Sequence, residues 1–307
     1  MVRAGLEPAV TSATISSVEV LDERGITRHD RASGEFSALL TGRRMLGAAR
    51  RGKFLWLPLA DVPDVAHDSG SADGSGIADP RQAVLVHLGM SGQVLLREAG
   101  APPDRHARVL LVVEHPLLGE LAIHFVDQRT FGSLAIDELI ATSDAQPGGR
   151  GTLLPLVPRQ AAHIARDPLD PAFDDTRFVR ALRERRTTVK RAMLDQTLVS
   201  GIGNIYADEA LWAARVHFEQ PTQTLSARRA GALLAEVRLV LQKALAEGGT
   251  SFDAQYVNVN GASGYFSHSL NVYGRQGLPC PRCGTPIVRV AFMNRSSHYC
   301  PRCQRRR

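Results

Sequence analysis

Four cysteines are the residues of this 307-residue chain whose spacing points most directly to chemistry. Cys280 and Cys283 form one Cys-x-x-Cys pair, Cys300 and Cys303 form a second, and 16 residues separate the pairs. Each pair places two thiolates on a tight turn, and two pairs complete the tetrahedral set that structural zinc prefers. Disulfides and redox dithiols are the alternatives, but no export signal is apparent and neither pair opens a βαβ unit. We therefore expect one structural Zn²⁺ bound by all four cysteines.

Positive charge is concentrated in two segments of a chain whose formal net charge is +6. The run 180–191 is rich in Arg and contains a single Glu, and the tail 280–307 contains no acidic residue. Basic charge gathered in separated segments suits a track along a phosphate backbone better than a uniformly solvated surface. The pattern indicates a nucleic-acid partner.

The composition is that of an ordinary globular protein, with 44% hydrophobic and 22% charged residues. No apolar run approaches the roughly 18 residues that a membrane-spanning helix needs. The N-terminus lacks the apolar core of a signal peptide. We expect a cytoplasmic protein that does not contact membranes.

Most of the first 140 residues have the pattern of strands. Short β-branched and apolar runs bounded by turn residues fill the chain from about residue 11 to 136 and predict a β-sandwich domain over 1–140. The segment 61–80 is rich in Asp, Ser and Gly, so we expect a flexible loop there. A Gly- and Pro-rich stretch then predicts a linker over 141–160.

After this linker the apolar period becomes helical, which predicts a helical domain over 161–268 and leaves 269–307 as the zinc finger. Asp174 and Ser226 are the expected N-caps of two helices. In the zinc finger we expect two short strands joined by a polar turn at 294–297, with Arg295 at its tip. Helical periodicity covers the segments 174–185, 189–198, 204–216 and 226–248.

The turn Gly201-Ile202-Gly203-Asn204 precedes one of these helices. Glycines let the backbone approach a ligand closely, and the N–H groups at a helix start attract phosphate. Asn204 could cap the helix and also donate to a phosphate oxygen. Simple turn geometry between two helices would require glycine as well, so the motif alone leaves both interpretations open.

Three stretches together resemble the formamidopyrimidine-DNA glycosylase family. They are HLGMSGQ (87–93), DQRTFG (127–132) and GIGNIYADEALW (201–212), the last in combination with the two CPRC motifs. The resemblance implies a multidomain α+β fold: an N-terminal β-sandwich, a helix–two-turn–helix domain and a C-terminal Cys₄ zinc finger. A helix–two-turn–helix protein bound to RNA or ribosomes is a weaker alternative.

The resemblance also implies an activity, which is base-excision repair. Family members are glycosylases and abasic-site lyases that remove oxidised purines such as 8-oxoguanine and formamidopyrimidines and nick the strand by β,δ-elimination. The implied partner is double-stranded DNA containing these lesions or abasic sites, and we expect a monomer with no cofactor other than zinc.

By the same resemblance, individual residues acquire roles. Flipping a damaged nucleotide leaves a hole in the base stack, and Met90, Arg129 and Phe131 match the residues that fill it. Without the resemblance these would be a buried strand Met, a surface Arg and a core Phe. The segment 249–266 matches the loop that closes over the flipped base. Lys53 and Arg295 match catalytic residues, and His106, Arg129, Arg186, Lys190 and Asn204 match contacts to DNA.

The family's nucleophile is the proline of an N-terminal Pro-Glu pair, whose amine attacks C1′ of the damaged nucleotide. In the printed sequence, residues 2–8 match a stretch inside the family's start, and the Pro-Glu pair is not among the 307 residues. One hypothesis is that translation starts upstream of Met1 and the product is an enzyme. The other is a protein that binds lesions or abasic sites without excising bases. We favour the enzyme, because Lys53 and Arg295 have little use in an inactive protein.

Overall fold

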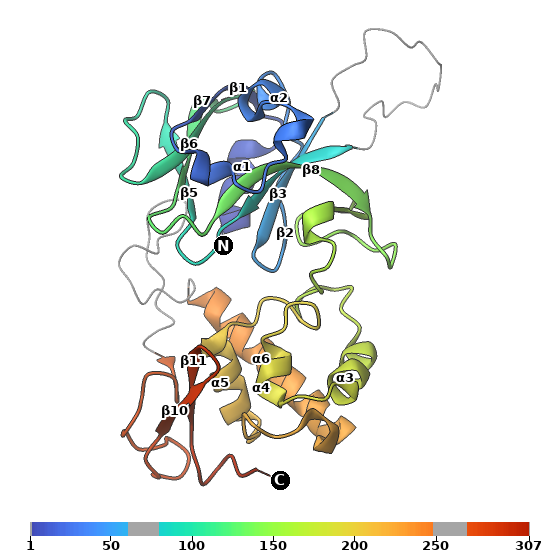
Figure 1. Cartoon of the computed structure of the whole chain (residues 1–307), viewed down its shortest axis with the longest axis vertical. Coiled ribbons are helices and arrows are strands. Elements are labelled where there is room, and N and C mark those ends of the chain that lie inside the picture. The colour runs from blue at the N-terminus through green and yellow to red at the C-terminus, as the bar shows by residue number, and fades with distance from the viewer. Residues whose placement is uncertain (1, 61–79, 248–268, 307) are drawn as a thin grey trace. The chain divides into compact units, whose positions relative to one another are not determined.

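The computed structural model describes residues 2–60, 80–247 and 269–306 (Figure 1). The chain divides into two compact units, with the boundary between Ala162 and His163. Nearly all of the expected flexible loop at 61–80, and all of the expected lesion loop at 249–266, lie outside the described residues.

The first unit contains two antiparallel sheets. One has the strand order β1-β6-β7-β5 and the other the order β2-β3-β4-β8-β9. The expected strand-rich pattern from about residue 11 to 136 is confirmed. The strands are β1 (Thr14–Val20), β2 (Ala49–Arg51), β3 (Phe54–Leu59), β4 (Gln82–His87), β5 (Gln93–Glu98), β6 (Ala107–His115), β7 (Gly119–Val126), β8 (Ser133–Ala141) and β9 (Leu156–Pro158).

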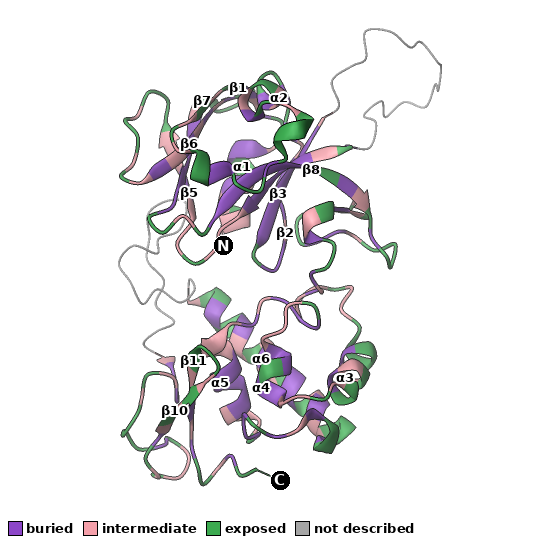
Figure 2. Ribbon diagram, in the orientation of Figure 1, coloured by how far each residue is buried: buried purple, intermediate pink, exposed green. Residues whose placement is uncertain are grey.

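One hydrophobic core lies between these sheets. Strand β6 alternates buried and half-buried residues, as a strand with one face on a core must. Its Leu111 and Val113 belong to the same buried cluster as Leu57 and Val84 of the other sheet. The expected β-sandwich is therefore confirmed, and the buried strands are visible in Figure 2.

Two features of the first unit were not expected. Helix α1 (Val2–Val10) precedes β1 and buries Leu6 and Val10 in the core. Strand β9 lies inside the predicted linker, where it pairs with β8. Backbone groups of this stretch complete a sheet, and the whole of 141–160 belongs to the first unit. The short helices of this unit are η1 (Glu23–Ile26), η2 (Arg31–Ser33), α2 (Phe36–Leu40) and η3 (Arg159–Ala161).

The second unit begins with helices whose caps agree with the sequence. Asp174 accepts a hydrogen bond from the Arg177 amide at 2.9 Å, and Ser226 accepts one from the Arg229 amide at 3.3 Å. The second expected helix is shorter than predicted, because Asp195 accepts from the amide and hydroxyl of Thr197 and forms a turn. The helices are α3 (Asp175–Glu184), α4 (Val189–Met193), α5 (Asn204–Ala213), η4 (Thr222–Thr224) and α6 (Ala227–Ala246).

The chain ends in a hairpin of β10 (Val288–Phe292) and β11 (Arg295–Tyr299). Its turn consists of Met293 and Asn294, one residue earlier than the expected turn at 294–297. Met293 has a φ of 53°, the left-handed conformation that a two-residue hairpin turn requires. Arg295 is consequently the first residue of β11, where it pairs with Phe292.

Across the described part of the chain, no helix combines the length and the hydropathy that a membrane crossing needs.

Candidate functional site

The four cysteines converge at the base of the β10–β11 hairpin. Their sulfur atoms all lie within 4.8 Å of one another, and the Cys283–Cys300 and Cys283–Cys303 pairs are 3.5 Å apart. Four thiolates about 2.3 Å from one tetrahedral zinc ion would be about 3.8 Å apart. The residues therefore fit a closed Cys₄ site that holds one structural zinc ion and offers no position to a substrate.

Neighbouring donors hydrogen-bond several of the ligand sulfurs, although burial raises the pKa of Cys300 to about 12. The indole Nε1 of Trp212 donates to Cys280 Sγ at 3.4 Å, and the Cys303 amide donates to Cys300 Sγ at 3.4 Å. Hydrogen bonds from Thr285 lower the pKa of Cys283 to about 6. These contacts orient the ligands, as outer-shell groups do in metal sites.

A buried ion pair joins this hairpin to the helices. Lys190 of α4 is fully buried, and its Nζ lies 2.7 Å from Asp208 Oδ1 of α5. The same ammonium donates to the carbonyl of Ser296 at 3.0 Å and to the hydroxyl of Ser297 at 2.8 Å, both on β11. Asp208 also accepts from the His298 amide at 2.8 Å. One charge pair thus holds two helices and a strand together.

Burial lowers the pKa of Lys190, and the nearby positive charge of Arg295 lowers it further, while Asp208 opposes the shift. Lys190 was expected to contact DNA. Since its ammonium has no solvent exposure and is bound by β11, it acts in this structure by positioning the hairpin.

Helix α5 binds the zinc finger along one face. Asn204, Asp208 and Trp212 recur at intervals of four residues, so they lie one above another on the helix. Adjacent Glu209 is buried and accepts four hydrogen bonds of 2.8 to 3.0 Å from residues 271–273, which lead into the finger. The finger is therefore fixed to the helices at several points along its length.

Arg295 lies at the tip of the hairpin that this network holds. It is exposed and makes no ion pair with another described residue. It lines a groove of about 360 Å³ together with Arg191 at α4 and Arg185 after α3. Arg185 is paired with Asp195, whereas Arg191 is exposed. Arg186, a predicted contact, is exposed on the same connection but is not among the groove residues.

The glycine turn lies beside this hairpin tip. Gly201 has a φ of 83°, which favours glycine, and the helix begins at Asn204. The N-cap is Gly203, so the expectation that Asn204 caps the helix is wrong. Asn204 Nδ2 instead donates to the Ser296 carbonyl at 3.0 Å. No side chain caps α5, which leaves its first N–H groups available to a ligand.

In the first unit, the buried carboxylate of Asp127 holds two loops together. It accepts from the Ser91 hydroxyl at 2.5 Å, from the Arg129 amide at 3.1 Å and from the Gly132 amide at 2.6 Å. Ser91 belongs to the motif HLGMSGQ and the two amides to DQRTFG. Asp127 therefore fixes both motifs relative to each other.

These two loops expose the predicted void-filling residues. Met90 retains 52% and Phe131 53% of its accessible surface, and Arg129 is also exposed. The interpretation as a buried Met and a core Phe is therefore wrong. Gly89 brings the loops into contact, because a Cβ atom there would lie 2.6 Å from the Phe131 carbonyl carbon. Only glycine permits this approach.

Lys53 approaches the same loops from the β2–β3 turn. Its Nζ lies 3.5 Å from the Gly89 carbonyl oxygen, and its charge acts on His87. Desolvation, with Arg28 and Lys53 nearby, lowers the pKa of His87 to about 4. His106 is half-buried, and its carbonyl accepts from the Asp127 amide at 3.0 Å.

Sequence reasoning did not identify Asp127, Asp208, Glu209 and His87 as residues of these sites. The signal for the first three was an acidic residue inside an otherwise apolar or small-residue run, where burial demands a partner. His87 stands inside HLGMSGQ, but its neighbours Arg28 and Lys53 come from distant parts of the sequence. Its position beside them depended on the fold.

A two-sheet sandwich, a helical unit with a glycine turn at a helix start, and a Cys₄ hairpin with an exposed arginine together define a zinc-finger protein built to bind nucleic acid. The family model "Formamidopyrimidine-DNA glycosylase N-terminal domain" matches residues 1–134, and the H2TH domain model of the same enzymes matches 164–255. The model "Zinc finger found in FPG and IleRS" matches 277–306.

Similar proteins agree along the whole chain. Formamidopyrimidine-DNA glycosylase of Leifsonia xyli is 61% identical over 99% of this chain and 97% of its own, and that of Nocardioides sp. is 53% identical over 99% and 92%. The structure resembles Thermus thermophilus MutM (Fpg), with a TM-score of 0.74, 32% identity and coverage of 100% and 97%. It also resembles Lactococcus lactis Fpg in complex with abasic-site DNA, with a TM-score of 0.75, 27% identity and coverage of 99% and 97%.

The chain belongs to the formamidopyrimidine-DNA glycosylase family, whose members are base-excision repair glycosylases. The expected architecture and the zinc finger are confirmed.

Comparing a zinc-ligand variant with an Arg295 variant should separate metal binding from DNA binding. We expect Cys300→Ser to lower zinc content from one ion per chain to none and to weaken binding to duplex DNA, because the hairpin loses its support. Arg295→Ala should weaken DNA binding while zinc remains at one per chain. Elemental analysis measures the zinc content and fluorescence anisotropy measures DNA binding. Loss of zinc in Arg295→Ala would mean that this arginine supports the zinc site and would contradict a role in contacting DNA.

Asp208→Asn should leave the buried ammonium of Lys190 without its counter-charge. Removing one partner of a buried pair costs about 3–5 kcal/mol in unfolding free energy. The double variant Lys190→Met/Asp208→Asn should be more stable than Asp208→Asn alone, because no unpaired charge remains and the His298 amide keeps an acceptor. Urea unfolding of the zinc-loaded protein checks this order, and equal stability of the two variants would refute it.

The depressed pKa of His87 gives a pH dependence of known sign. The ordinary pKa is 6.5 and the folded value about 4, so the unfolded chain takes up a proton first as the pH falls. The contribution of His87 to stability is complete above pH 6.5 and is lost between pH 6.5 and 4. As the pH falls from 6.5 to 4, the unfolding free energy of the wild type should decrease relative to that of His87→Gln. An NMR titration of His87 with a midpoint near 6.5 would disprove the assignment.

Proposed function

We propose that this family member removes oxidised purines, such as 8-oxoguanine and formamidopyrimidines, from duplex DNA and cuts the strand by β,δ-elimination. The observation that carries the proposal is the exposure of Met90, Arg129 and Phe131 on two loops fixed by Asp127. Large apolar side chains on a fixed surface can enter the space that a flipped base leaves. An arginine beside them can hydrogen-bond the orphaned base.

The second unit supplies contacts to the DNA backbone in this proposal. Arg295 and Arg191 line one groove, and exposed Arg186 lies on the adjoining connection. The uncapped start of α5 offers N–H groups to a phosphate, with Asn204 at its first position. Similar solved structures are Lactococcus lactis Fpg in complex with abasic-site DNA and a mutant of that protein in complex with Fapy-dG DNA. These complexes support lesion-containing duplex DNA as the substrate.

The elimination steps require groups that act on the sugar and its phosphates. We assign these roles to Lys53, as an amine near the Met90 loop, and to Arg295, as a fixed cation for the flanking phosphates. An amine attacks C1′, the base leaves, and the resulting Schiff base undergoes elimination. All the assigned groups belong to one chain, which supports a monomer, and we place it in the bacterial cytosol.

The proposal is tested by excision of 8-oxoguanine paired with cytosine. We expect Met90→Ala/Phe131→Ala to lower kcat/KM on the order of 100-fold, or about 2.7 kcal/mol. Zinc content and stability should stay unchanged. Leu117→Ala/Leu118→Ala, at two exposed apolar residues of the β6–β7 turn, is the matched control and should retain activity. Equal activity in both variants would reject the void-filling role.

Lesion binding without excision is a second candidate function, because the exposed side chains of Met90, Arg129 and Phe131 would serve it equally well. Borohydride trapping on the same duplex distinguishes the two. An enzyme that excises the base through an amine gives a trapped covalent complex, which is the result we expect, whereas a protein that only binds lesions gives none. Absence of a trapped complex from protein that binds the duplex would reject the glycosylase proposal.

A further inference from the structure

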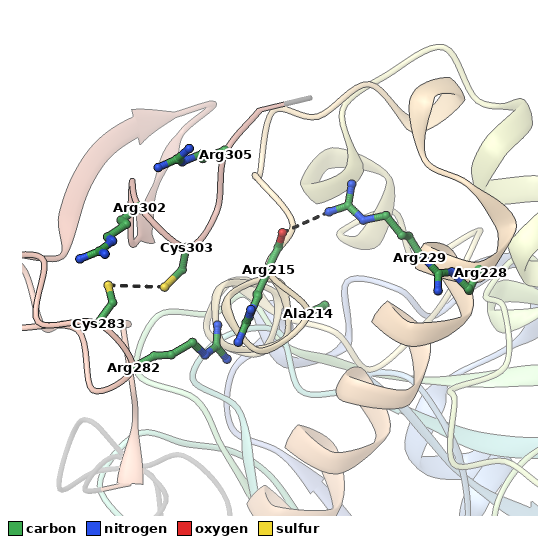
Figure 3. A pocket seen from close by; sticks show the side chains of 9 residues that line it. All are labelled: Ala214, Arg215, Arg228, Arg229, Arg282, Cys283, Arg302, Cys303 and Arg305. Atoms are coloured by element: carbon green, nitrogen blue, oxygen red, sulfur yellow. Dashed lines mark hydrogen bonds between the residues drawn. The ribbon is translucent and has the colours of Figure 1, made fainter.

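A second basic pocket lies in the helical unit, apart from the groove of Arg295. Its volume is about 720 Å³, and it is formed where α5 ends, where α6 begins and where the two Cys-x-x-Cys turns meet (Figure 3). No acidic side chain lines it. The lining arginines are Arg215, Arg228, Arg229, Arg282, Arg302 and Arg305.

The two basic regions lie at opposite ends of α5. Asn204, at the first turn of the helix, contacts Ser296 beside Arg295. Trp212, near the last turn, contacts Cys280 at the base of the zinc finger. Ten helical residues with a rise of 1.5 Å separate these ends by about 15 Å. The arginine pocket is therefore a different surface from the groove assigned to lesion DNA.

Two of the six arginines have structural tasks. Arg282 lies 4.2 Å from the Trp212 ring and donates to the carbonyls of Trp212 and Ala213, which satisfies the C-terminal end of α5. Arg229 donates to the Arg215 carbonyl, a contact drawn in Figure 3, and to Gln220.

The other four arginines have exposed side chains with no hydrogen bond or ion pair to any described residue. They are Arg215, Arg228, Arg302 and Arg305. A zinc ion with four thiolates carries a net charge of about −2, which would offset at most half of them. Arg228 also lies in the first turn of α6, where the positive end of the helix dipole repels a cation. An anionic ligand would relieve this repulsion.

We propose that this pocket binds the sugar–phosphate backbone of a second DNA segment. Arginines from three separate parts of the fold are spread around a space larger than one phosphate, which suits a ligand with several phosphates in a row. Duplex DNA offers about one charge per 1.7 Å of its axis. The chain can then hold one duplex at the lesion-binding surfaces and touch another here. Such contact permits direct transfer between DNA segments without full dissociation.

The proposal is tested with two duplexes of different label. Wild-type protein is first saturated with a duplex that carries a non-hydrolysable analogue of 8-oxoguanine, so that it binds without turnover. A labelled undamaged duplex is then titrated, and its fluorescence anisotropy reports the second binding. We expect a ternary complex whose formation weakens steeply with salt. Arg228→Gln/Arg302→Gln/Arg305→Gln should weaken the second binding at least about tenfold and reduce its salt slope by about 2 to 3. Binding of the first duplex should be unchanged.

The control removes the same charge elsewhere. Arg31→Gln/Arg44→Gln/Arg81→Gln, at exposed arginines of the β-sheet unit, should keep the second binding. Since Arg302 and Arg305 lie close to zinc ligands, zinc content is measured in each variant. Arg215→Gln/Arg228→Gln changes two pocket arginines that lie outside the zinc-binding turns. This variant should also weaken binding of the second duplex, but less than the triple variant does.

Several results would overturn the proposal. They are the absence of a ternary complex with wild-type protein, or equal second binding by the pocket variants. Displacement of the second duplex by tripolyphosphate at an equal concentration of charge would show a site for small anions. Displacement by polyglutamate with equal strength would show a site for acidic protein. Excision activity is scored separately, so a failure here and a failure of the proposed repair function are distinguishable.

Discussion

The ion pair between Lys190 and Asp208 is the interaction on which the arrangement of the second unit depends. Two charges with almost no solvent exposure are stable only when each finds a partner and its remaining hydrogen bonds. Here the remaining donors and acceptors come from β11, so satisfying the charges also places the hairpin. The position of Arg295 at the hairpin tip therefore follows from the need to pair these two buried charges.

The β-sheet unit uses the same principle with a different residue. Asp127 has no solvent exposure, and its carboxylate is satisfied by donors from the two loops that carry Met90 and Phe131. Exposed apolar side chains would normally fold back onto the protein surface. Here the backbone amides of the loop are bound to a buried carboxylate, which restrains the loop from folding back with its side chains. In both units, a buried acid therefore holds segments whose exposed side chains we propose to contact DNA.

The sequence predicted those features that depend on local spacing. Two Cys-x-x-Cys pairs identified the metal site, alternating apolar runs identified most strands, and Asp174 and Ser226 were confirmed as caps. It did not predict features that depend on partners far along the chain. Strand β9 formed in a presumed linker because β8 offered an open edge. Lys190 was predicted to be a surface cation that contacts DNA. Its acceptors lie on β11, more than a hundred residues later in the sequence, so local spacing could not reveal its burial.

The attachment of the zinc finger to α5 bears on how separable the finger is. The finger has its own family model, named for its occurrence in both FPG and IleRS, which makes it look like an exchangeable module. In this chain, however, its metal ligand Cys280 and the segment leading into it are bound by Trp212 and Glu209 of α5. Transplanting residues 277–306 into another scaffold would leave these groups behind. A functional graft would have to include the matching face of α5, so the unit of protein engineering here is the helix and finger together.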